Sequence, residues 1–66
     1  MAIKLDRDIY TTTEIAALLN KTPQAIRARV RAGHIEATNI GKNYIITREA
    51  LAAFLEKAGV EYEREN

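Results

Sequence analysis

The stretch TTTEIAALLNKTPQAIRARVRAG, residues 11–33, decides the fold. Thr11 and Glu14 have the spacing of a capping box, in which two residues at a helix start satisfy each other's backbone N–H groups. The apolar residues that follow recur three and four positions apart, as on one face of a short helix. We therefore expect a helix over 12–19 that ends at Asn20, because Asn tolerates the left-handed conformation that closes helices.

A second helix start follows almost at once. Thr22 is a favourable N-cap, and Pro23 suits the first helical position, where no N–H is needed. Ile26 and Val30 recur four apart, and Gly33 provides the stop. Two short helices joined by a tight turn predict a helix-turn-helix.

Two short strands are expected next, over 35–40 and 44–46, around a basic turn that contains glycine. The register stays open. Pairing Ile40 with Ile45 leaves 42–43 as the turn, whereas a three-residue loop shifts the pairing.

Thr47 is expected to cap a third helix that ends at Gly59. The predicted fold is therefore mostly α with a small β-hairpin, a winged helix-turn-helix. Residues 1–8 alternate apolar and charged and form either a short strand or a lead-in, while the end of the chain either extends the third helix or frays. We expect one domain over residues 1–66, with a lead-in 1–10, a core 11–59 and a charged tail 60–66.

One apolar cluster is expected to hold these elements together. Its members are Ile15, Leu18, Leu19, Ile26, Val30, Ile35, Ile46, Leu51, Phe54 and Leu55.

The composition excludes several classes of function. The 66 residues contain no Cys and only one His, so disulfide frameworks and metal sites built from Cys or from several His residues are excluded. No titratable groups converge as a catalytic site requires, and no apolar run is long enough to cross a bilayer. We expect a cytoplasmic protein that is not an enzyme and binds no cofactor, metal, membrane or small-molecule ligand.

The charge is concentrated in the middle of the chain. The formal net charge is only +1, but residues 21–48 alone sum to +5, between acidic blocks of −1 over 1–20 and −3 over 49–66. A basic block of this kind suits a polyanion such as a nucleic acid, although solvated helix faces also carry such charges.

Three motifs point to a known family: T-x-x-E-x-A at 11–16, R-x-G-x-I at 31–35, and G-K-N-Y at 41–44 followed by T-R-E-A-L. On these motifs the chain resembles the excisionase-type, mercury-regulator-like winged helix-turn-helix family from Tyr10 to Leu55. The resemblance implies DNA binding, with the second helix in the major groove.

The chain departs from the family's usual pattern at three places. Asn20-Lys21 stands where the family usually has Gly-Val at the bend, and Arg29 stands where it often has Leu or Trp. Ile45 replaces a frequent Arg or Lys, so this wing is less basic than is typical for the family.

The second helix has an apolar side with Ile26 and Val30. Helical spacing places Gln24, Arg27 and Arg31 on the opposite side. We expect Arg27 to contact guanine, Gln24 to read adenine, and Arg31 to hold a phosphate. The pattern fits two roles for Arg29 equally well: its aliphatic part packs on the edge of the core, or its guanidinium contacts a phosphate. Thr22 is expected to cap the helix in preference to contacting a phosphate. The expected DNA-binding residues are Lys21, Thr22, Gln24, Arg27, Ala28, Arg29, Arg31, and Lys42 and Asn43 of the wing.

The leading hypothesis is a phage or bacterial excisionase-like protein, a recombination directionality factor. It would bind attachment-site DNA cooperatively and direct an integrase toward excision, with double-stranded DNA and the integrase as partners and copies associating head to tail. One alternative is a small stand-alone transcription regulator of the mercury-regulator type. A second, from another class, is a protein-interaction module.

Overall fold

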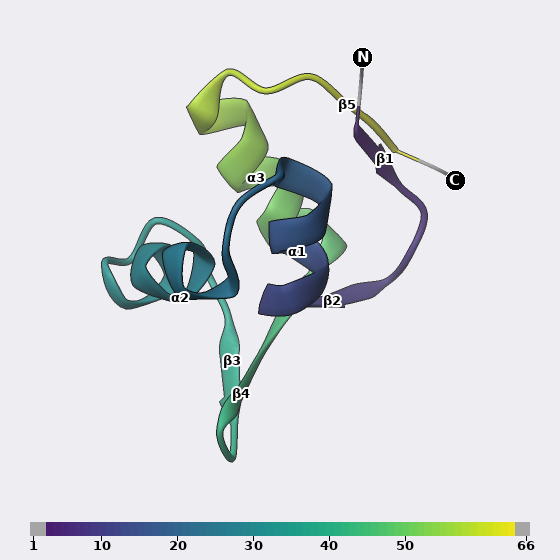
Figure 1. The fold of residues 1–66 in the computed structure, drawn as a ribbon. Helices are drawn as coiled ribbons and strands as arrows, with labels where there is room; N and C mark the ends of the chain where they lie inside the picture. Colours follow the sequence, from purple (N-terminus) through teal and green to yellow (C-terminus); the bar gives the residue numbers. More distant parts are fainter. Residues whose placement is uncertain (1–2, 65–66) are drawn as a thin grey trace.

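The computed structural model describes residues 3–64; Met1, Ala2, Glu65 and Asn66, at the ends of the expected lead-in and tail, lie outside them. Figure 1 shows the helices gathered together, a hairpin that extends away from them, and the strands β1 and β5 side by side. None of the described helices is long and apolar enough to cross a membrane. The elements are β1 (Ile3–Leu5), β2 (Ile9–Thr11), α1 (Thr12–Leu19), α2 (Pro23–Arg31), β3 (Thr38–Ile40), β4 (Asn43–Thr47), α3 (Arg48–Ala58) and β5 (Tyr62–Arg64).

The capping box that begins α1 is formed as predicted. The Glu14 N–H donates to Thr11 Oγ1 at 3.2 Å, and the Thr11 N–H donates to Glu14 Oε1 at 2.9 Å. The Arg7 guanidinium also pairs with the Glu14 carboxylate. The hydrogen bond from the Thr11 backbone and the charge of Arg7 lower the pKa of Glu14.

All three helices end in the same way. Asn20, Gly33 and Gly59 follow the three helices and have φ angles of 57°, 84° and 72°, in the left-handed region. In each case the next N–H donates to the carbonyl five residues earlier, at 2.8 or 2.9 Å. The predicted stops are confirmed, and the turn between α1 and α2 is fixed by this geometry.

The wing belongs to a three-stranded antiparallel sheet in the order β2-β4-β3, where a two-stranded wing was expected. Tyr10 of β2 pairs with Ile46, so part of the expected lead-in is the third strand. The pairing of Ile40 with Ile45 is wrong, since Ile40 pairs with Asn43. The turn is therefore Gly41-Lys42, with Gly41 at φ 62°, a conformation that glycine adopts without a steric penalty.

The first and last of the described strands form a second, parallel sheet. β1 and β5 pair with Ile3 opposite Tyr62 and Leu5 opposite Arg64. The described part of the tail therefore neither extends α3 nor frays, because its backbone finds partners in β1. Leu5 is fully buried, which gives this pairing an apolar anchor in the core.

One core connects these elements, and it differs from the expected cluster at several positions. Leu18 is 39% exposed, because the α1 face that packs inward is centred on Ile15 and Ala16. Leu19, Val30 and Phe54 are only partly buried and pack at the edge. The buried apolar side chains are Leu5, Tyr10, Ile15, Ala16, Ile26, Ile35, Ile46, Leu51, Ala52 and Leu55.

Candidate nucleic-acid interface

The way α2 packs determines which of its side chains face outward. Ile26 is buried at 2% exposure, so the opposite side of the helix, with Gln24, Ala28 and Arg31, lies in solvent. Arg27 is half-buried on the flank that faces the wing. A helix with one outward polar face and a free side toward a hairpin has the arrangement that winged helix-turn-helix proteins use.

Thr22 serves as the N-cap of α2. The Ala25 N–H donates to Thr22 Oγ1 at 3.1 Å, and Pro23 occupies the first turn without needing a partner. The capping role expected for Thr22 is present. Pro23 has no N–H, and the Ala25 and Ile26 N–H groups both donate to Thr22, so the Gln24 N–H is the first-turn group left at this end of α2, where the helix dipole favours an anion.

A hollow of about 450 Å³ separates α2 from the hairpin, and we call it the wing groove. Three cationic side chains from two elements converge there, and within the described part of the chain none of the three makes an ion pair. No carboxylate is among its lining residues, so the groove suits an anionic surface. Its lining consists of Arg27, Arg31, Asn39, Gly41, Lys42 and Tyr44.

Asn39 was not expected in this groove, and the strand register explains its position. It pairs with Tyr44, so both side chains lie on the same face of the sheet. That face also carries Ile46, which is buried in the core two residues farther along β4. With the correct register of the hairpin, Asn39 and Tyr44 would have been predicted to lie on the face of the sheet that lines the wing groove. Composition and charge gave no signal for Asn39.

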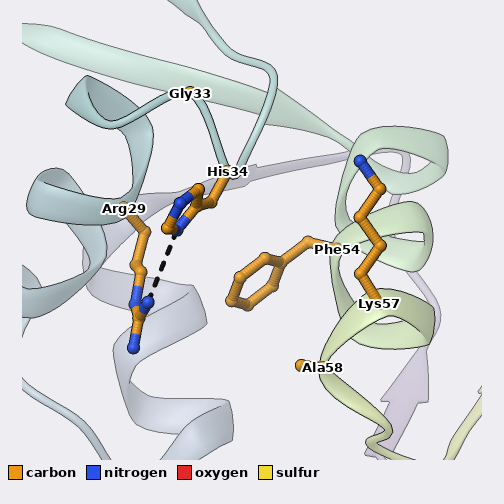
Figure 2. A pocket seen from close by; sticks show the side chains of 6 residues that line it. All are labelled: Arg29, Gly33, His34, Phe54, Lys57 and Ala58. Atoms are coloured by element: carbon orange, nitrogen blue, oxygen red, sulfur yellow. Dashed lines mark hydrogen bonds between the residues drawn. The ribbon is translucent and has the colours of Figure 1, made fainter.

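Lys21 and Arg29 are not brought into the wing groove. Successive helical residues are rotated by about 100°, so Arg29 lies about 200° around α2 from Arg27. Arg29 Nη1 instead lies 3.4 Å from His34 Nδ1, in a hollow against Phe54 of α3 (Figure 2). Lys21 lines an adjoining hollow on the same side. Asn43 is exposed beside the wing turn and does not line the wing groove.

Three helices, a small antiparallel sheet with a protruding hairpin, and the cationic wing groove define a winged helix-turn-helix of the DNA-binding class. Residues 9–59 match the model of the helix-turn-helix domain family, and the chain belongs to that family. No curated protein and no solved structure matches the chain significantly. The matched residues include α1, α2, the wing and α3, so the DNA-binding unit of the family is present.

Proposed function

We propose that the protein binds double-stranded DNA sequence-specifically, with α2 in the major groove and the wing along the adjacent backbone. The observation that carries this proposal is the wing groove, where Arg27 and Arg31 of α2 face Lys42 of the hairpin. A phosphate backbone that passes between the helix and the hairpin would meet Arg31 and Lys42, while Arg27 on the same flank of α2 reaches the base edges.

Four side chains of α2, three on its outward side and Arg27 on the flank toward the wing, have specific parts in this proposal. Arg27 donates two hydrogen bonds to guanine, and Gln24 pairs with adenine nearer the start of the helix. Ala28 lies about one turn beyond Gln24 on the outward face of α2 and leaves room for close approach to a thymine methyl group. Arg31 and Lys42 contact phosphates, which sets the position of the protein without reading sequence.

Further phosphate contacts come from Thr22 at the start of α2 and from Asn43 at the wing. Arg29 and Lys21 are left out of this set, because both line the hollows on the flank of α2 opposite the wing groove. With about four to six phosphates contacted, log affinity is expected to fall with log salt at a slope of about −4 to −5.

The resemblance of the capping-box, helix-end and wing motifs to excisionases supports a more specific role. In this role the protein coats attachment-site DNA in several copies and directs an integrase toward excision. Glu61 and Glu63 are exposed at the end of the chain, where they can face the basic middle of a neighbouring copy. Such a contact is head-to-tail and does not close on itself.

Two experiments test the proposal at its two levels. Selection of tight binders from random duplexes should yield a shared DNA sequence. A mobility-shift titration of the protein on a duplex with that sequence should then give a ladder of complexes.

The second experiment is an excision assay with integrase and attachment-site DNA. Excision is expected to occur only when the protein is present. A single complex with no effect on excision contradicts the excisionase role and favours a discrete-site regulator. No shift at low salt contradicts DNA binding itself and favours a protein-interaction module.

A further inference from the structure

A second groove runs between α2 and α3, on the side of α2 away from the wing. Its first part is a hollow of about 420 Å³ around Phe54, closed on one side by Arg29 and His34 and on the other by Lys57 (Figure 2). Its second part, of about 390 Å³, shares Arg29 and Phe54 with the first and extends toward the turn between α1 and α2. The two hollows therefore adjoin at these side chains, and we call them together the α2–α3 groove.

The floor of this groove is apolar. Figure 2 shows the Phe54 ring directed from α3 toward Arg29 and His34, with Ala58 one turn farther along the helix. Leu19 and Val60 line the floor in the second hollow. These side chains are only partly covered by the chain itself, so an apolar side chain of another molecule would remove further apolar surface from water.

The rim of the groove is cationic. Lys21, Arg29 and Lys57 lie along it, and no carboxylate is among the residues that line either hollow. None of the three forms an ion pair within the described residues; the contact of Arg29 is with the His34 ring. The remaining N–H groups of the guanidinium are therefore available for a bidentate contact with a carboxylate.

The charges also indicate in which direction an occupant extends. A third hollow, of about 350 Å³, adjoins the groove at His34 and Lys57, but Glu36 and Glu49 line it. An acidic occupant is repelled there, so it runs from Lys57 past Arg29 toward Lys21.

A protein segment fits this groove better than a DNA backbone does. The sugar–phosphate surface offers charge to the rim but has no large apolar group to fill the floor at Phe54. Arg29 also lies on the flank of α2 opposite Arg27, which faces the wing. A protein bound in the α2–α3 groove therefore leaves the wing groove open for DNA.

The chain's own acidic end is a poor occupant, even from a second copy. In that segment the apolar side chains of Val60 and Tyr62 pack against the core of their own molecule. Among residues 60–63, where burial is described, Glu61 and Glu63 are the exposed ones, so this stretch of a neighbouring copy offers carboxylates without an apolar anchor. We propose that the α2–α3 groove is the docking site for an acidic segment of a different protein, one in which a large apolar side chain is flanked by Asp or Glu.

The test is a selection of random peptides displayed on phage against the wild-type protein, followed by affinity measurements with the enriched peptides. The decisive variant is Arg29→Glu/Lys57→Glu, since both side chains are exposed and the fold is checked by circular dichroism. The matched control is Arg27→Ala/Arg31→Ala, which alters the wing groove only. We expect acidic peptides with one large apolar residue, at least tenfold weaker binding to the charge-reversed variant, and unchanged binding to the control.

Three results overturn the proposal. The first is no enrichment, or enriched peptides that bind the charge-reversed variant equally well. The second is a loss of DNA affinity in Arg29→Glu/Lys57→Glu as large as in the Arg27→Ala/Arg31→Ala control, which makes the groove a DNA-backbone contact. The third is loss of concentration-dependent self-association in the charge-reversed variant, measured by sedimentation, which makes the occupant a second copy. The docking site is tested by peptide binding, whereas the proposed function is tested by the DNA affinity of the Arg27→Ala/Arg31→Ala variant. A failure of one proposal is therefore distinguishable from a failure of the other.

Discussion

Arg27 and Arg29 are two residues apart on α2 and lie on opposite flanks of it, Arg27 in the wing groove and Arg29 beside His34. The single helix therefore separates two cationic hollows of similar size, about 450 Å³ and about 420 Å³. The hairpin side of the first is lined by the polar side chains of Asn39, Lys42 and Tyr44, whereas the floor of the second is the apolar ring of Phe54. This difference in lining is the physical reason for assigning DNA to the first and an acidic protein segment to the second.

Arg27→Ala is expected to weaken DNA binding about tenfold or more and to relax the preference for guanine at one position. The physical reason is that a bidentate contact to guanine contributes about 1–3 kcal/mol of discrimination. Arg29→Ala is the matched control, with an expected change of under about threefold, since its side chain contacts His34. Fluorescence anisotropy on the selected duplex and its single-base variants checks both. Equal losses for the two variants contradict the separation of the hollows.

Lys42→Ala is expected to weaken binding by a similar factor on every duplex and to lower the salt slope by about 1, because Lys42 is assigned to a phosphate. Titrations at several salt concentrations measure the slope. An unchanged slope, or a loss confined to one DNA sequence, shows that the wing tip does not hold the backbone.

Leu5→Ala is expected to destabilise the fold by about 2–5 kcal/mol, since this side chain is fully buried. Ile9→Ala is the control. Ile9 lies in β2, the next strand along the chain, but is 54% exposed, so the expected loss of stability is under about 1 kcal/mol. Urea unfolding followed by circular dichroism measures both free energies of unfolding. Similar small costs contradict the placement of β1 in the core.

Glu14→Gln is expected to reduce the loss of stability on acidification. The pKa of Glu14 is lowered in the fold, so its carboxylate stabilises the protein above the ordinary glutamate pKa, and this contribution is lost as pH falls through the lowered pKa. Gln keeps the side-chain oxygen of the capping box but does not titrate in this range. Urea unfolding at about pH 7 and about pH 3 compares the two proteins. An identical pH dependence means that the pairing with Thr11 and Arg7 adds no stability.

The helices were predictable from the sequence because their signals are local. Thr11, Thr22 and Thr47 each accept a hydrogen bond from the N–H three residues on, as their positions before an apolar repeat indicated. Asn20 and Gly59 end α1 and α3 for an equally local reason, their tolerance of positive φ.

The pairings of β1 with β5 and of β2 with β4 were not predictable, because each joins residues distant in the chain. The alternation around Leu5 is compatible with a strand but names no partner, and the partner proved to be β5 at the other end. Tyr10 likewise joins β4 across both helices of the helix-turn-helix. In the wing, the expected register differed from the observed one, so the pairing of Asn39 with Tyr44 was not predicted. These two residues line the hairpin side of the wing groove, and their place there was therefore missed.

The central claim is that DNA lies in the wing groove, and a mobility-shift titration of wild type and Arg27→Ala/Arg31→Ala tests it most directly. Both proteins are titrated onto random duplex at about 50 mM and about 200 mM salt. We expect the wild type to shift the duplex and to weaken steeply with salt, and the double variant to bind at least tenfold more weakly at the lower salt. Equal shifts by the two proteins, or no shift by the wild type at low salt, contradict the claim.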